Sequence, residues 1–322
     1  MSDTAIRVAI IGLGIMGRRM LTNMDGHAAF DLAGAWDPDA AACAAAQGDV
    51  PGLQIANSAA DLIAASDTDL VYIACPPRWH REYADLAMDA GKPIYCEKPL
   101  GIDLDDSEAF VARLDETGTP NIVNFAQAAC RAVTDMDAAV KSGATGSVSG
   151  LDAIVHFSRW PRDWQADADW LRYRDQGGYT REVLSHFLYV IERLMGPAEL
   201  LSATPVYQND PALCETHITA VFDCNGVPVT MLGTSGGAGP DRVELTLWGE
   251  DKSYRLHDWF CLQVSDGDDW QQQYAEVPDL RVDSFARQLD GVAAWMRGGD
   301  HPMPSAQDAL SVQNLIEAML QD

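Results

Sequence analysis

Basic side chains are scarce in this sequence of 322 residues, where 22 lysines and arginines face 48 aspartates and glutamates and the net charge is −26. Nucleic acid and the anionic surface of a membrane would repel such a chain, and no run of lysine and arginine forms a local basic patch. We therefore expect neither as a partner. The acidity is explained most simply by solubility or by a salt-rich habitat.

Paired cysteine motifs and long apolar runs are also missing. The seven cysteines include no Cys-x-x-Cys pair and no cysteine–histidine spacing typical of a metal site. The simplest interpretation is a reduced, cytoplasmic chain that holds no metal. No apolar run approaches about 18 residues, and the start of the chain lacks a basic segment. We therefore expect neither a membrane helix nor a signal peptide.

The first third of the chain alternates short apolar runs with amphipathic stretches. The runs predict buried strands and the stretches predict helices, which together are typical of βαβ units in a parallel sheet. Ligands of such sheets bind at the carboxyl ends of the strands. The predicted strands are 5–11, 30–36, 69–75, 93–96 and 121–125, and the predicted helices are 15–26, 39–47, 58–66, 79–90 and 103–117.

The pattern changes after about residue 125. Residues 199–275 are mostly strand-like runs separated by turns, which predicts a mostly antiparallel sheet, and helical patterns flank it at 131–142, 182–195, 283–297 and 305–320. The predicted fold is α/β. An N-terminal Rossmann domain with a doubly wound parallel sheet (residues 1–124) precedes an α+β domain with a large, mostly antiparallel open sheet (residues 125–322).

A glycine-rich loop follows the first predicted strand and opens the first predicted helix. Residues 12–17 read Gly-Leu-Gly-Ile-Met-Gly, the G-x-G-x-x-G pattern of dinucleotide-binding folds. The glycines would allow a tight turn, a close approach of the backbone to a pyrophosphate, and close packing of helix on strand. The alternative is a glycine-rich loop without a ligand. The residues expected to bind a cofactor here, with the helix N-terminus supplying N–H groups, are Gly12, Gly14, Ile15, Met16 and Gly17.

An aspartate ends the second predicted strand. Asp37 lies 20 residues after Gly17, where a carboxylate would bind the ribose hydroxyls of NAD and repel the 2′-phosphate of NADP. The alternative is an ordinary turn aspartate, because Asp37-Pro38-Asp39 is also a favourable start for a helix. We therefore expect NAD as cofactor. NADP stays possible because Arg18 and Arg19 could reach a 2′-phosphate.

Two further motifs follow predicted strands of the first domain. The strand at 69–75 runs into Cys75-Pro76-Pro77-Arg78-Trp79-His80, and the strand at 93–96 runs into Glu97-Lys98-Pro99. Together with the glycine loop, with Gly177-Gly178 and with Asp308-Ala309-Leu310, they make the chain resemble the Gfo/Idh/MocA family of sugar and polyol oxidoreductases. The tripeptide Glu-Lys-Pro is common by itself, but in this order and spacing it is specific. The resemblance covers nearly the whole chain.

The resemblance implies a lysine whose ammonium touches both the cofactor and the reacting oxygen, here Lys98, with Pro76 and Glu97 also near the cofactor. Partial desolvation beside a positively charged nicotinamide would lower the pKa of such a lysine, and its ammonium would stabilise a developing alkoxide. The resemblance also implies a cis Lys98–Pro99 bond. The alternative is a surface lysine in a turn. His80 either lies near the cofactor or simply starts a helix.

In the resembling family an acidic residue stands four positions before a histidine, and these two map onto Glu182 and His186. On a helix this spacing puts both on one face. We expect His186 to take the proton of a substrate hydroxyl, Glu182 to bind a neighbouring hydroxyl or the imidazole, and Lys98 to hold the reacting oxygen. The family usually has aspartate where this chain has Glu182, and Arg181 could pair with that glutamate. The alternative for His186 is a core histidine.

Segment 159–174 is unusual in so acidic a chain, because it holds three tryptophans and four arginines. Aromatic faces suit sugar rings and arginine suits carboxylate or phosphate. We expect Trp160, Trp164 and Arg172 to contact the substrate. The alternatives are a subunit interface, or arginines neutralised by nearby aspartates, namely Asp163, Asp167, Asp169 and Asp175.

The leading functional prediction is an NAD(P)-dependent oxidoreductase that transfers hydride between the cofactor and a hydroxyl or carbonyl carbon of a sugar, polyol or sugar acid. One alternative keeps the fold but reduces a dihydrodiol, a tetrapyrrole or an imine. Another is a non-catalytic regulator that senses NAD. The resemblance also implies a homodimer or homotetramer formed through the second domain's sheet.

Overall fold

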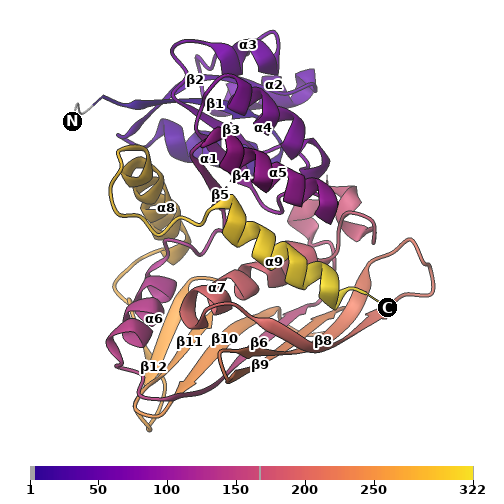
Figure 1. Cartoon of the computed structure of the whole chain (residues 1–322), viewed down its shortest axis with the longest axis vertical. Coiled ribbons are helices and arrows are strands. Elements are labelled where there is room, and N and C mark those ends of the chain that lie inside the picture. Colours follow the sequence, from indigo (N-terminus) through magenta and orange to yellow (C-terminus); the bar gives the residue numbers. More distant parts are fainter. Residues whose placement is uncertain (1–3, 167, 322) are drawn as a thin grey trace. The chain divides into compact units, whose positions relative to one another are not determined.

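The computed structural model describes residues 4–166 and 168–321 (Figure 1). The chain divides into two compact units. Unit 1 comprises Met1–Phe125 and Phe285–Leu310, and unit 2 comprises Ala126–Ser284 and Ser311–Asp322. Unit 1 thus differs from the domain 1–124 drawn from the sequence by a segment that returns to it near the end of the chain.

Unit 1 is built on a parallel sheet of five strands in the order β2-β1-β3-β4-β5. Except for β2, the strands are nearly continuous runs of buried residues, as expected where both faces of a sheet are covered. The predicted Rossmann sheet is therefore confirmed. Its strands are β1 (Ile6–Ile11), β2 (Phe30–Trp36), β3 (Leu70–Ile73), β4 (Ile94–Glu97) and β5 (Asn121–Asn124).

The helices of unit 1 begin and end at residues suited to those positions. Asp39, Ser58 and Asp103 accept hydrogen bonds from backbone N–H groups of the helices that they precede, and α5 ends at Gly118 with a φ of 62°. The helices are α1 (Ile15–Asp25), α2 (Ala40–Asp49), α3 (Ala59–Ala64), η1 (Pro77–Trp79), α4 (His80–Asp89), α5 (Leu104–Thr117) and α8 (Leu280–Met296), which enters unit 1 at Phe285.

The returning segment completes the β5 side of the sheet. The Val123 N–H donates to the Pro304 carbonyl at 2.8 Å, and the Ala306 N–H donates to the Asn121 side chain at 2.9 Å. Without these bonds the last strand of the sheet would expose unpaired backbone groups. The segment also contributes buried apolar side chains, among them Leu289, Val292 and Met303.

Unit 2 is built on a mixed sheet of eight strands in the order β13-β12-β11-β10-β6-β9-β8-β7. Among the described strand pairs of this sheet, only the β6–β9 pair is parallel. The predicted large, mostly antiparallel sheet is therefore confirmed. The strands are β6 (Val148–Phe157), β7 (Glu199–Tyr207), β8 (Glu215–Cys224), β9 (Val227–Ser235), β10 (Arg242–Gly249), β11 (Ser253–His257), β12 (Cys261–Ser265) and β13 (Gln271–Gln272).

One face of this sheet carries the helices of unit 2, with α6 and α7 packed against each other (Figure 1). Along β6 the inward residues are buried and the alternate residues are partly exposed. On the other face Leu232 and Trp248 stay exposed. The helical segments are α6 (Arg131–Ser142), η2 (Asp163–Gln165), η3 (Asp169–Arg172), η4 (Thr180–Leu184), α7 (Ser185–Met195) and α9 (Ala306–Met319), which enters unit 2 at Ser311.

Across the described part of the chain, no helix combines the length and the apolar character that crossing a membrane requires.

Candidate active site

The glycine loop of unit 1 is shaped by steric limits at two of its glycines. Gly12 has a φ of +96°, and a Cβ there would lie 2.5 Å from the Cys75 nitrogen. A Cβ on Gly17 would lie 1.9 Å from the Gly12 carbonyl oxygen. Any larger residue at either position would push α1 away from the strands.

Gly14 differs because an added Cβ would meet nothing within 4 Å. It is the N-cap of α1, it offers no side chain to the helix, and the first turn holds no acidic residue. The first N–H groups of the helix, which include those of Ile15 and Met16, have no partner within the helix and carry partial positive charge. This arrangement fits a pyrophosphate.

Asp37 follows β2 and binds the glycine loop directly. Its Oδ2 accepts a hydrogen bond from the Leu13 N–H at 2.7 Å, and its Oδ1 accepts one from the Asp39 N–H at 2.8 Å. The helix-start role proposed as an alternative for this region belongs to Asp39, which caps α2. Asp37 thus stands at the carboxyl end of the second strand, joined to the loop that would hold the phosphates.

Arg18 and Arg19 are the residues that left NADP as an alternative cofactor in the sequence analysis. Both have partners inside unit 1. Arg18 forms an ion pair with Asp49 at 2.6 Å. Arg19 donates to the Met16 sulfur at 3.5 Å, and its guanidinium lies 5.9 Å from the centre of the Phe285 ring. These contacts favour NAD over NADP at this site.

Lys98 directly follows β4, and the residue before it is anchored in the core. The buried Glu97 carboxylate accepts hydrogen bonds from the Tyr72 hydroxyl and the Asn124 amide, each at 2.5 Å. Burial and the nearby Glu97 charge raise the pKa of Tyr72. Because the carboxylate is engaged inside unit 1, contact of Glu97 with a cofactor stays a prediction. Lys98 itself is half-buried, and the Lys98–Pro99 bond is cis, as the resemblance implies.

His80 and Pro76 lie on the neighbouring strand end. Pro76 is exposed and precedes η1, while His80 begins α4 and is fully buried. The His80 ring nitrogens lie 2.8 Å from the Pro99 carbonyl oxygen and 2.9 Å from the Cys75 carbonyl oxygen. His80 therefore starts a helix, as one of the two alternatives predicted, and it also connects two loops.

In unit 2, Glu182 lies in η4 and His186 is the second residue of α7. The expected α-helical spacing is wrong for part of this segment, because Thr180–Leu184 form a π-helical turn. A π turn closes over five residues and rotates the chain less per residue, so Glu182 is turned relative to the expected face. Such turns are frequent at functional sites. His186 is buried, at 7% exposure.

The start of this segment is fixed by a buried carboxylate on β8. The Glu215 carboxylate accepts a hydrogen bond from the Thr180 N–H at 2.8 Å, and a Cβ on Gly178 would lie 2.7 Å from its Oε2. A Cβ on Gly177 would lie 2.4 Å from the Leu171 carbonyl oxygen. The two glycines are therefore needed for close approach.

Arg181, which the sequence allowed to pair with Glu182, pairs with another carboxylate. Arg181 forms a two-pronged ion pair with Glu317 of α9, at 2.6 and 2.7 Å. It also donates to the carbonyl oxygens of Arg174 and Gly177. A planar guanidinium can satisfy all of these acceptors at once, whereas its neighbour in the sequence points elsewhere around the helix.

Trp259 is a site residue that the sequence did not reveal. Its ring meets the His186 ring edge-on, with centroids 6.0 Å apart at 85°. It sits in the turn between β11 and β12, where Asp258 and Trp259 have φ values of 46° and 74°, uncommon for residues with side chains. The Gln127 side chain donates to its carbonyl at 3.0 Å. A large aromatic residue in a tight turn was the available signal.

The segment 159–174 is only partly open to a ligand. The Trp160 indole N–H donates to the Leu171 carbonyl at 3.0 Å, so this ring belongs to the local packing, whereas Trp164 is 48% exposed. Arg172 lies 3.3 Å from Asp169 and Arg159 lies 2.7 Å from Asp163, as the neutralisation alternative predicts. Asp167 lies outside the described residues. The substrate contacts of Trp160, Trp164 and Arg172 stay predictions.

Arg162, which the sequence did not single out, is surrounded by aromatic rings. Its guanidinium carbon lies 4.7 Å from the ring centres of Phe157 and Trp164, 5.5 Å from that of Trp259 and 5.9 Å from that of Trp160. Such contacts hold a cation by the negative faces of the rings. Through Trp259, this cluster continues to His186.

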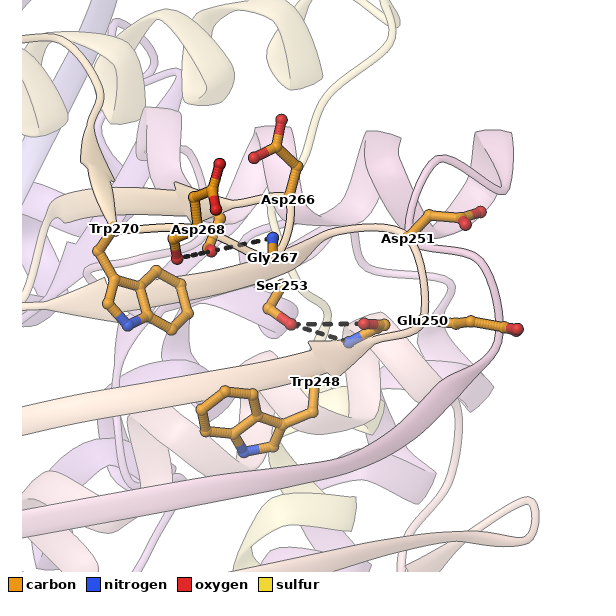
Figure 2. A pocket seen from close by; sticks show the side chains of 10 residues that line it. Trp248, Glu250, Asp251, Ser253, Asp266, Gly267, Asp268 and Trp270 are labelled. Atoms are coloured by element: carbon orange, nitrogen blue, oxygen red, sulfur yellow. Dashed lines mark hydrogen bonds between the residues drawn. The ribbon is translucent and has the colours of Figure 1, made fainter.

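Unit 2 also holds a pocket and a group of three side chains that could bind a metal. A pocket of about 280 Å³ opens between the turns after β10 and β12, lined by Trp248, Trp270 and four carboxylates (Figure 2). Those carboxylates would repel a pyrophosphate, so this pocket is not the dinucleotide site. Among the described residues, a metal could also be considered at His257, Asp258 and Cys261, whose ligand atoms lie within 4.8 Å of one another.

Comparisons with known proteins test the family. The model of the GFO_IDH_MocA oxidoreductase family, with its NAD-binding Rossmann fold, matches residues 6–125. Inositol 2-dehydrogenase 3 of Saccharopolyspora erythraea is 30% identical over 333 aligned positions, which cover 98% of this chain and 92% of that protein. The chain belongs to the Gfo/Idh/MocA family. The Rossmann fold and NAD as cofactor, both predicted from the sequence, are confirmed with it.

Two other known proteins resemble this Gfo/Idh/MocA member in a more limited way. One matches over part of its sequence, and the other is similar in fold. An inositol 2-dehydrogenase of Corynebacterium glutamicum is 33% identical over 152 residues, so that the matched region spans 47% of this chain and 45% of that protein. The WlbA dehydrogenase from Bordetella pertussis, solved with NADH and UDP-GlcNAcA, has a TM-score of 0.82 at 20% identity and covers 99% of this chain and 95% of its own. The latter likeness shows the fold alone.

Proposed function

We propose that this protein is an NAD-dependent dehydrogenase that oxidises a secondary hydroxyl of a sugar or cyclic polyol, and that it runs the reverse reduction with the same groups. The observation that carries the proposal is the carboxyl edge of the unit 1 sheet. There the open glycine loop, Asp37 and Lys98 follow β1, β2 and β4, the strand ends at which ligands of such sheets bind. The inositol 2-dehydrogenase relatives support a cyclic polyol as substrate.

The proposed division of labour assigns one task to each group. Bound NAD would supply the acceptor of two electrons. His186 takes the proton of the reacting hydroxyl on its imidazole while the Lys98 ammonium donates a hydrogen bond to the oxygen and stabilises its developing negative charge. Glu182 binds a neighbouring hydroxyl. The carbon–hydrogen bond of the same carbon would break and give its hydride to that acceptor, so the carbon–oxygen bond becomes a carbonyl as the proton leaves for His186.

Three features of unit 1 and unit 2 support these assignments. Lys98 is held by a neighbour whose carboxylate is fixed in the core, which limits the positions of its ammonium. His186 is buried beside an aromatic ring, and a π turn carries Glu182. Positioned groups of this kind are what proton transfer requires.

The test is reduction of NAD⁺, followed optically, with a panel of inositols, aldoses and sugar acids. We expect turnover with one substrate group and a loss of at least about 100-fold in Lys98→Ala and in His186→Ala. Lys141→Ala, an exposed lysine on α6, is the matched control and should keep full activity. NADH binding should survive in both active-site variants. Turnover that is unchanged in Lys98→Ala would reject the mechanism.

We also infer a cytoplasmic homodimer or homotetramer. The seven cysteines are all free, which fits a reducing compartment. The helix-free face of the unit 2 sheet exposes Leu232 and Trp248, and apolar side chains on an open face favour association. Light scattering coupled to gel filtration should give a multimer mass, and Leu232→Glu should lower it. A monomer mass for the unmodified protein would contradict the inference.

A further inference from the structure

His80 occupies an unusual electrostatic position in unit 1. It is fully buried, and each of its ring nitrogens faces a backbone carbonyl oxygen. Nδ1 lies 2.8 Å from the Pro99 oxygen and Nε2 lies 2.9 Å from the Cys75 oxygen. Pro99 lies just beyond β4, and Cys75 lies just beyond β3, so a single side chain joins the ends of two adjacent parallel strands.

The two carbonyl partners restrict the protonation state of the His80 ring. A backbone carbonyl oxygen can only accept a hydrogen bond, so each nitrogen that binds one must carry a proton. Neutral imidazole carries a proton on one nitrogen only. With one proton, the other nitrogen would point its lone pair at a carbonyl oxygen within hydrogen-bond distance. Both contacts are satisfied together only by the imidazolium.

The surrounding charges act in both directions. Burial disfavours the cation. The Asp37 and Glu82 carboxylates favour it, since their charges add to burial in raising the pKa of Cys75, whose own carbonyl His80 contacts, to about 12. Glu97, two residues before Pro99, also favours it, whereas Lys98 opposes it through its own positive charge. Two hydrogen bonds from a charged donor offset the cost of burial.

The consequence concerns Lys98. On its N-terminal side, the Glu97 carboxylate is fixed by Tyr72 and Asn124. On its C-terminal side, the Pro99 carbonyl is fixed by His80. The lysine is therefore the one residue between two anchored neighbours. His80 also contacts the Cys75 carbonyl, which lies just beyond β3. The contact on the C-terminal side of Lys98 is therefore tied to the end of the neighbouring strand.

We propose that His80 is a positioning residue for the reaction, which as a doubly donating imidazolium ties the Pro99 carbonyl to the Cys75 carbonyl and so holds Lys98 in place. The role of Lys98 itself rests on the proposed function. No atom of His80 needs to touch substrate or cofactor. Loss of the clamp lets the Lys98 backbone shift, and misplacement of a catalytic group by about 1 Å can cost on the order of 100-fold in rate.

A double-mutant cycle on turnover tests the coupling to Lys98. We expect His80→Ala to lower kcat by about 10- to 100-fold with the KM for NAD changed less than about threefold. In the Lys98→Ala background the same substitution should change the residual rate less than about twofold, because there is no ammonium left to misplace. An equal loss in both backgrounds would assign His80 a general structural role and overturn the proposal.

Thr68→Val is the matched control. Thr68 is a buried residue of unit 1 whose hydroxyl donates to the Leu62 carbonyl at 2.9 Å, so this variant also loses a buried bond from side chain to backbone. It should lower the melting temperature and leave kcat unchanged. If Thr68→Val lowers kcat as much as His80→Ala does, turnover reports on stability alone and the proposed clamp is rejected.

The state of the ring can be measured without turnover. Nitrogen NMR of the unmodified protein labelled at histidine should show, at pH 7, one residue with both ring nitrogens protonated, and His80→Gln should remove that signal. A single protonated nitrogen would overturn the doubly donating clamp whatever the variants do. Turnover retained in Lys98→Ala would reject the proposed function, while the NMR result would still report on His80.

Discussion

Asp37 binds the backbone on both sides of the turn in which it lies. Its two oxygens accept backbone N–H groups of Leu13 and Asp39, which fixes the carboxylate relative to the glycine loop. The spacing between Gly17 and Asp37 predicted that this carboxylate lies at the end of the second strand, because the spacing is that of one βαβ unit. The second hydrogen bond could not be predicted, since it depends on how the loop folds back onto β2.

At Asp37, substitution by alanine should raise the KM for NAD by about 10-fold or more, since hydrogen bonds to a charged group contribute about 1.5–3 kcal/mol. The preference for NAD over NADP should fall, because the repulsion of the 2′-phosphate is removed. Initial rates with each cofactor measure both effects. Asp39→Ser, which keeps the helix cap, should leave the cofactor ratio unaltered, and a ratio that is unchanged in Asp37→Ala as well would contradict the role given to Asp37.

Glu215 makes stability depend on pH. Burial raises the pKa of this carboxyl, and the Thr180 N–H and the Arg181 charge only partly oppose the shift. The folded protein therefore holds this proton to a higher pH than the unfolded chain does. The stabilisation is complete below the usual pKa range of glutamate and is lost as pH rises through the raised pKa.

The variant Glu215→Gln keeps an oxygen acceptor for the Thr180 N–H without the buried charge. It should therefore melt at a higher temperature than the unmodified protein near pH 8, with the difference shrinking toward pH 4. Thermal unfolding across this range measures the difference. A gap that is constant, or that grows as the pH falls, would contradict the raised pKa.

Trp259 and Arg162 mark the limit of residue-level prediction. The catalytic candidates Lys98 and His186 stand in local motifs, so their spacing in the sequence carries the signal. Trp259 reaches His186 from a hairpin more than seventy positions later, and the same ring reaches Arg162 from a similarly distant part of the chain. Contacts of this kind depend on tertiary packing, which a local pattern does not encode.

Among the elements, the segment that carries Glu182 and His186 departs most from expectation. The sequence predicts one helix over 182–195, whereas the structure has a π turn followed by α7. Helical periodicity does predict that a helix exists there. It does not predict the π turn, because the start of that turn is bonded to Glu215 on β8 and its Arg181 is bonded to Glu317 on α9.

The ion pair between Arg181 and Glu317 should be important for this element. The two side chains are 12% and 19% exposed. Removal of one partner leaves a largely buried charge alone, so Arg181→Met should cost about 3–5 kcal/mol of folding free energy. Chemical denaturation measures the loss.

The exposed pair of Arg159 with Asp163 provides the control for that experiment. These side chains are 74% and 85% exposed, so Arg159→Ala should cost less than about 1 kcal/mol. Equal losses in the two arginine variants would show that burial of the Arg181 pair has no special energetic weight.

At the scale of the whole molecule, unit 1 is discontinuous in sequence. The sequence places its end where the alternation of strand and helix stops, near residue 125. It could not predict the return of Phe285–Leu310, because an amphipathic helix shows which face is apolar and not which core will cover it. Gln288, which donates to Asn124, and Met303, which is buried, show that this segment belongs to unit 1.

A fragment of residues 1–125 should therefore be less stable than the same fragment joined by a flexible linker to residues 285–310. Without the second piece, the β5 side loses its bond to the Pro304 carbonyl, and apolar surface on unit 1 is uncovered. Circular dichroism during heating, together with the soluble yield, compares the two. Equal melting temperatures would mean that the returning segment is dispensable for the fold.

The return of Phe285–Leu310 also affects how the chain folds during translation. The first 125 residues emerge early, yet their last structural partner is made only after nearly all of unit 2. At about 5–20 residues per second, this delay is on the order of ten to forty seconds. During that interval the nascent first unit keeps an open strand edge, which makes it a natural client for a chaperone that holds exposed β-structure.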